Sequence, residues 1–123
     1  MTILPSHLLE RECSAIATFT HSLSDFLGDD LRYLWLFGSK ARGDFEEDSD
    51  IDLLIVLNHL TSERRGVIRR MAAHVSLDYD VLFNTHLYEK GRWDAIVAQR
   101  DTLWREVQRD GIPLRDLLAQ TIS

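Results

Sequence analysis

Two aspartates, Asp50 and Asp52, lie at the start of an apolar run that extends to Leu57. Side chains alternate between the two faces of a strand, so both carboxylates project from the same face. At ~4 Å and an effective dielectric constant of about 20, two like charges repel by roughly 4 kcal/mol, so a cation is expected between them. Oxygen ligands favour Mg²⁺ or Mn²⁺ over zinc. The pair therefore predicts a metal site at the beginning of a buried strand.

A Gly-Ser pair precedes these carboxylates in the sequence. Gly38 follows an apolar run and lets the backbone turn sharply and approach a ligand closely. Ser39 offers a hydroxyl and an N–H group at the start of a helical turn, where anions bind well. Lys40 and Arg42 add positive charge to the same loop. Phosphate groups on one side and carboxylates on the other, bridged by metal, are typical of a nucleoside triphosphate site.

A third carboxylate is expected from a neighbouring strand, predicted at Leu77 to Phe83. Asp78 and Asp80 share one face of that strand, in the pattern already seen at Asp50 and Asp52. A third carboxylate suits a two-metal site for phosphoryl transfer. Asp80 lies deeper among apolar neighbours, where an unpaired charge costs more, whereas Asp78 also suits an exposed strand edge. Both residues remain candidates.

The remaining elements must position these groups. Period-three and period-four apolar patterns predict a helix from about Ser6 to Leu27 and a second helix from Ser62 to about Ala73. A strand is expected at Leu31 to Phe37, and a turn at residues 58–61. A long helical stripe runs from Trp93 to Val107, and residues 114–122 form either a short last helix or a frayed end. The outer side of the second helix is either a solvated face or a basic patch for an acidic partner, formed by Arg64, Arg65, Arg69 and Arg70.

Composition limits the class of protein. A chain of 123 residues fits one domain, expected at 1–123. The net charge of −6 argues against general nucleic-acid binding, and no apolar run has the length of a membrane helix. Cys13, the only cysteine, is interpreted as a packing residue, and a single cysteine fits a reducing cytoplasm. The five histidines have no metal-ligand spacing, so neither zinc nor a histidine base is expected.

The string Gly-Ser-Lys-Ala-Arg-Gly-Asp, followed by Ser-Asp-Ile-Asp-Leu-Leu, carries a family resemblance. With ten residues between Gly38-Ser39 and Asp50-Ile51-Asp52, it resembles the signature of the DNA polymerase β-like nucleotidyltransferases, and in particular their minimal nucleotidyltransferase (MNT) branch. The resemblance implies an α/β (α+β) fold, with a small mixed sheet flanked by helices. It further implies that Asp50 and Asp52 bridge two Mg²⁺ ions and that Asp80, favoured over Asp78, binds the ion that activates the acceptor.

The same resemblance implies a reaction and a partner. Gly38 and Ser39 would hold the phosphates of ATP, Lys40 or Arg42 would help to neutralise them, and AMP would pass to a hydroxyl group. MNT proteins resemble antitoxins, so the expected acceptor is a tyrosine of a helical HEPN-domain toxin, in a type VII-like toxin–antitoxin pair. Two alternatives stay open. One is an antitoxin that neutralises its toxin by binding alone, and the other is an aminoglycoside-type nucleotidyltransferase that needs a homodimer to form its acceptor pocket.

Overall fold

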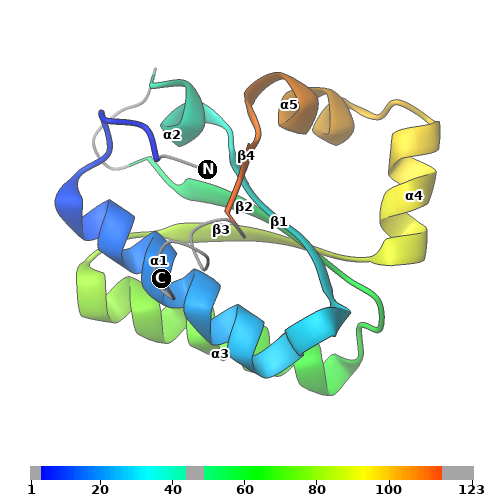
Figure 1. The fold of residues 1–123 in the computed structure, drawn as a ribbon, viewed down its shortest axis with the longest axis horizontal. Helices are drawn as coiled ribbons and strands as arrows, with labels where there is room; N and C mark the ends of the chain where they lie inside the picture. The colour runs from blue at the N-terminus through cyan, green and yellow to red at the C-terminus, as the bar shows by residue number, and fades with distance from the viewer. Residues whose placement is uncertain (1–3, 44–48, 115–123) are drawn as a thin grey trace.

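The computed structural model describes residues 4–43 and 49–114 of the chain. These residues form ten elements in an order that alternates helices and strands (Figure 1). The elements are α1 (Glu10–Leu27), the short 3₁₀ helix η1 (Gly28–Asp30), β1 (Leu31–Phe37), α2 (Ser39–Arg42), β2 (Ile51–Leu57), α3 (Ser62–Tyr79), β3 (Phe83–Glu89), α4 (Lys90–Ala98), α5 (Thr102–Asp110) and β4 (Ile112–Pro113).

The four strands form one mixed sheet in the order β3-β2-β1-β4. β1 pairs antiparallel with both β2 and β4, whereas β2 and β3 run parallel, with α3 as the crossover between them. The expected α/β fold, with a small mixed sheet flanked by helices, is therefore confirmed. The expected strand from Leu31 to Phe37 has the bounds of β1.

Helices cover both faces of this sheet. In Figure 1, α1 and α3 lie on one side, and α2, α4 and α5 lie on the other. The predicted alternation along β2 is confirmed, because Leu53 and Ile55 join the core formed with α1 and α3, whereas Leu54 and Val56 pack with residues of α4 and α5. Burial on both faces explains why β2 is an almost continuous apolar run.

The prediction of a strand from Leu77 to Phe83 is wrong. The inward-facing positions of α3 continue at helical spacing through Ile68, Ala72 and Val75, so the helix extends to Tyr79 rather than ending near Ala73. Asp80 then ends the helix in the left-handed conformation, with φ of 55°, a geometry that aspartate tolerates better than most residues. β3 begins only at Phe83.

The long helix predicted over the Trp93–Val107 stripe is in fact two helices. Arg100, two residues after the end of α4, has φ of 50°, and this left-handed residue separates α4 from the next helix. The Asp101 carboxylate then accepts a hydrogen bond from the Leu103 N–H and caps α5. Of the predicted last segment, only Leu114 falls within the described residues; residues 115–122 lie outside them. None of the described helices is both long and apolar enough to cross a membrane.

Candidate active site

Gly38 and Asp52 are packed directly against each other. The backbone of Gly38 has φ of 77° and ψ of −160°, a combination that only glycine adopts readily. A Cβ atom built on Gly38 would lie 2.4 Å from Oδ2 of Asp52. Glycine is therefore required here for two reasons, its backbone conformation and the closeness of the carboxylate. The structure therefore brings the Gly-Ser loop against the second aspartate, as the sequence predicts.

Asp52 lies in a row of side chains that crosses three strands. Its partner on β1 is Phe37, and its partner on β3 is Asn84. The amide nitrogen of Asn84 donates a hydrogen bond of 2.9 Å to Oδ1 of Asp52. Nε2 of His86 lies 3.4 Å from the same oxygen, and the His86 ring meets that of Phe37 edge-on, with centroids 5.0 Å apart. Three strands thus position one carboxylate, which keeps about a fifth of its surface exposed at 22%.

The other carboxylates fall in different places. Asp50 directly precedes β2 and is exposed to solvent, beside the strand that carries Asp52. Asp78 and Asp80 are exposed at the end of α3, because the predicted strand register there is wrong. Within residues 4–43 and 49–114, no three His, Cys, Asp or Glu side chains gather closely enough to hold a metal ion. The position opposite Asp52, expected to hold the third carboxylate, is occupied by Asn84.

Lys40 does not face the expected phosphate site. Its side chain is 1% exposed, and its ammonium forms a 2.7 Å ion pair with Oε2 of Glu12 on α1. The other carboxylate oxygen of Glu12 accepts the N–H of Leu9. Nε2 of His7 contacts the backbone carbonyl of Lys40 as well. These contacts fasten the Gly-Ser loop to the N-terminal part of the chain, so Lys40 has a structural role.

Arg42 is half-exposed and connects the Gly-Ser loop to the end of α5. Its guanidinium lies 2.9 Å from Oδ2 of Asp110, a carboxylate that also pairs with Arg109. The hydrogen bond from Arg109, supported by that from Arg42 and opposed by burial, lowers the pKa of the Asp110 carboxyl. At neutral pH this ionised carboxylate holds α2 and α5 together.

Two further predictions concern side chains away from the site. Burial, followed by the nearby Glu12 and Glu10, raises the pKa of the Cys13 thiol, which agrees with its interpretation as a packing residue rather than a nucleophile. Arg64, one of the four arginines of the possible basic patch, pairs with Asp30 beside β1. That arginine therefore serves the fold, whereas Arg69 and Arg70 are exposed.

The sequence interpretation missed Asn84 and His86. Both residues are part of β3. The available signal was the alternation in Phe83–Glu89, where Phe83 and Leu87 face the core with α1 and α3, and Asn84 and His86 face Asp52. A strand placed at residues 77–83 concealed this alternation.

Comparisons with known proteins agree with this geometry. The family described as "Nucleotidyltransferase domain" matches residues 22–107, which include the Gly-Ser loop, Asp50 and Asp52. "Putative protein adenylyltransferase MJ0141" of Methanocaldococcus jannaschii is 40% identical over 76 residues, which are 61% of this chain and 77% of that protein. "Putative protein adenylyltransferase MJ0604" of the same organism is 47% identical over 45 residues, covering 37% of this chain and 45% of that protein.

A solved structure shares the fold. A chain in the crystal structure of a mutant of the toxin–antitoxin MntA-HpeT matches with a TM-score of 0.50 at 17% identity, covering 85% of this chain and 72% of that chain. The family match spans well over half of the sequence and includes the packed Gly38–Asp52 pair. The chain therefore belongs to the nucleotidyltransferase domain family.

Proposed function

We propose that this protein transfers AMP from ATP to a hydroxyl group of a partner protein. The observation that carries the proposal is the contact between Gly38 and Asp52, which brings a Gly-Ser loop suited to phosphate against a metal-binding carboxylate. The family match supports nucleotidyl transfer, and the names of the two Methanocaldococcus relatives support a protein acceptor.

The residues present fit Mg²⁺. This ion is usually bound through one or two carboxylates together with phosphate oxygens of the substrate, and it demands oxygen ligands. Asp52 and the exposed Asp50 supply two carboxylates at the beginning of β2, beside the Gly-Ser loop. When bound there, Mg²⁺ would offset the negative charge of the triphosphate and favour loss of the acceptor's proton.

The chain's own groups have separate tasks in this reaction. The Ser39 hydroxyl holds the terminal phosphates, and the absent side chain of Gly38 lets the Asp52 carboxylate lie against the loop that holds them. Asn84 keeps the Asp52 carboxylate in one orientation through its 2.9 Å hydrogen bond. The acceptor oxygen then forms a bond to the α-phosphorus and releases its proton to the surrounding water. The bond from that phosphorus to the bridging oxygen breaks, and pyrophosphate leaves with the electron pair.

A protein acceptor is supported by the surface beside the site. Two large apolar side chains, Leu77 and Leu82, are 82% and 59% exposed where α3 leads into β3. The Leu82 carbonyl accepts the N–H of Ile51, so this surface adjoins Asp50 and Asp52. Exposed apolar groups at a catalytic edge suit docking of another protein. We propose that this partner is a helical HEPN-domain toxin, that its modified group is a tyrosine, and that the pair works in the cytoplasm.

The test is a transfer assay with the protein encoded beside this one as the acceptor. ATP and Mg²⁺ should raise the intact mass of that protein by one AMP unit, with release of pyrophosphate. Asp52→Asn should reduce the rate by at least about a hundredfold, because it removes a metal ligand. Asp25→Asn is the matched control, since Asp25 is exposed on α1. A stable complex that never acquires AMP would instead favour neutralisation by binding alone.

A further inference from the structure

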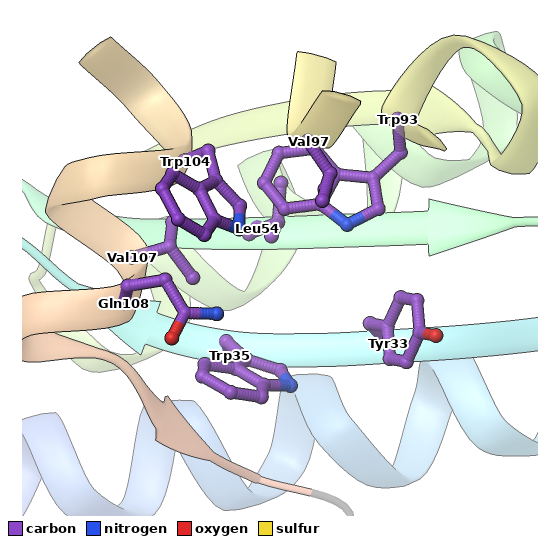
Figure 2. Close-up of a pocket in the computed structure, with 8 residues that line it drawn as sticks. All are labelled: Tyr33, Trp35, Leu54, Trp93, Val97, Trp104, Val107 and Gln108. Atoms are coloured by element: carbon purple, nitrogen blue, oxygen red, sulfur yellow. The ribbon is translucent and has the colours of Figure 1, made fainter. Parts of the chain in front are cut away.

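An aromatic cavity lies between the sheet and the helices α4 and α5. Its volume is about 240 Å³. The aromatic cavity is lined by Tyr33 and Trp35 of β1, Leu54 of β2, Trp93 and Val97 of α4, and Trp104, Val107 and Gln108 of α5 (Figure 2). The chain has three tryptophans, and all three line this one cavity. Tryptophans that only pack in a core would fill the space between the sheet and the helices, whereas these three border an open cavity.

The cavity lies on the same face of the sheet as Asp52. Leu54 is two residues further along β2, on the side toward which Asp52 also projects, and it pairs with Trp35 just as Asp52 pairs with Phe37. Two residues along a strand span ~7 Å. A single ribose separates the α-phosphate of a nucleotide from its base, so a triphosphate held at Asp52 would bring its base within reach of this cavity.

The lining has the chemistry of a base-binding site. Trp35 and Trp104 are only half-buried, and their rings border the open space. Aromatic rings stack on the flat faces of nucleobases. Figure 2 shows the amide of Gln108 extending from α5 into the region between the Trp35 and Trp104 rings. A glutamine amide can both donate to and accept from the N6/N7 edge of adenine, which supplies a preference that apolar walls cannot give.

We propose that the aromatic cavity binds the nucleobase of the nucleoside triphosphate, with a preference for adenine. This inference rests on the proposed nucleotidyl transfer, because the phosphates held at Ser39 and Asp52 are what bring the base here. An aromatic side chain of the acceptor protein is the competing occupant. The amide of Gln108 favours the nucleobase, since a base has a donor–acceptor edge that the ring of a tyrosine lacks.

Tryptophan fluorescence gives a direct test, since every tryptophan lines the cavity. In the presence of Mg²⁺, ATP should quench the emission, whereas inorganic tripolyphosphate should bind without quenching it. Trp104→Ala should weaken ATP binding about tenfold and leave the affinity for tripolyphosphate unchanged. Calorimetry supplies both affinities, so the result does not depend on the fluorescent group that the substitution removes.

A substitution at an exposed residue tests the same assignment without disturbing the packing of the core. Gln108 is exposed on α5, so Gln108→Ala should keep the fold while reducing the preference for ATP over GTP. Gln99→Ala, at the exposed end of α4, is its matched control and should leave that preference unchanged. Unchanged ATP affinity in both Trp104→Ala and Gln108→Ala would overturn the base assignment. If transfer to the partner falls at the same time, the acceptor ring occupies the cavity instead.

The two proposals can fail separately. If tripolyphosphate and ATP bind with equal affinity and Asp52→Asn abolishes both, the triphosphate site stands and the base site is overturned. If neither compound binds in the presence of Mg²⁺, both proposals are overturned.

Discussion

The two faces of the sheet are built for different purposes. Toward α1 and α3, the side chains of Phe19, Leu53 and Ile55 are all 0% exposed and belong to one continuous core. Toward α4 and α5, a smaller cluster leaves the aromatic cavity of about 240 Å³. A closely packed face determines the fold, and it allows the opposite face to remain incompletely filled and to hold ligands.

The burial of charged groups also differs between the two faces. The Glu12–Lys40 pair, beside α1, is almost fully enclosed, with side chains 5% and 1% exposed. Asp52, on the cavity face, remains open to solvent at 22% and contacts Asn84 and His86 rather than a lysine or an arginine. A carboxylate that no lysine or arginine among these contacts neutralises can accept a metal ion, whereas one already paired with a lysine cannot.

The largest effect should come from separating the enclosed ion pair. Lys40→Met leaves Glu12 buried without its counter-ion and should reduce the free energy of unfolding by about 3–5 kcal/mol. The double variant Glu12→Gln/Lys40→Met should recover most of that loss. Lys90→Met removes the exposed Lys90–Asp94 pair and should change stability by about 0.5 kcal/mol or less. Urea denaturation measures all three. Equal losses for Lys40→Met and Lys90→Met would refute a structural role for Lys40.

Substitutions at two adjacent leucines compare the packing of the two faces directly. Leu53 and Leu54 are both buried in β2 but point to opposite sides. Leu53→Ala should lower the free energy of unfolding by about 2–5 kcal/mol, as expected for a closely packed core. Leu54→Ala should cost less, because Leu54 already borders a cavity and makes fewer contacts there. Thermal or urea unfolding decides the order, and a larger loss for Leu54→Ala would mean that the cavity face is the better packed.

A methyl group at Gly38 should disturb the site more than the fold. Gly38→Ala adds backbone strain of about 1–3 kcal/mol and forces Asp52 to move. Binding of ATP with Mg²⁺, measured by calorimetry, should be lost at ordinary nucleotide concentrations. Gly91→Ala is the control, since nothing lies within 4 Å of a Cβ built there and the residue is helical. That variant should be neutral or slightly stabilising.

Asn84 and Asp80 test which residue supports Asp52. Asn84→Ala removes the hydrogen bond to Asp52 and should lower the rate of AMP transfer about tenfold, with Asn84→Gln, which keeps an amide donor, retaining more activity. Asp80→Asn changes an exposed residue at the end of α3 and should keep the rate within about twofold. Initial rates at saturating ATP measure both. If Asp80→Asn loses transfer and Asn84→Ala does not, Asp80 is the third carboxylate that the sequence predicts.

The smallest expected effect is the loss of stability when Asp110 is protonated at low pH. Because hydrogen bonds from Arg109 and Arg42 lower the pKa of Asp110, this group stabilises the folded protein above the ordinary aspartate pKa of about 3.9. The contribution is lost as the pH falls through the lower folded-state pKa. Asp110→Asn should therefore reduce stability at pH 7 and have little effect near pH 2. Urea unfolding at both values measures it, and an equal loss at each would contradict the linkage.

The sequence was sufficient for the parts in which local pattern and topology agree. Gly38 and Ser39 directly follow β1, and Asp52 lies in β2, the antiparallel neighbour of β1, so the short separation in sequence was enough to predict their proximity. The failure at residues 77–83 has a physical cause. Leu77, Asp78, Tyr79 and Asp80 alternate like a strand, but the burial of α3 against α1 carries the helix to Tyr79. The partner of Lys40 could not be predicted, because Glu12 is distant in sequence and meets it only through packing of α1.

The shortest strand has a consequence for the order of folding. β4 pairs only with Trp35 and Leu36, and together with the bond from the Leu114 N–H to the Leu34 carbonyl it returns the end of α5 to the sheet. The sheet and the helices α1 and α3 share many contacts of their own, so they can assemble first. We expect α4 and α5 to dock afterwards as a separate cooperative unit with lower opening free energy. Amide hydrogens in α4 and α5 should exchange faster than those in α3, and a ligand in the aromatic cavity should slow their exchange selectively.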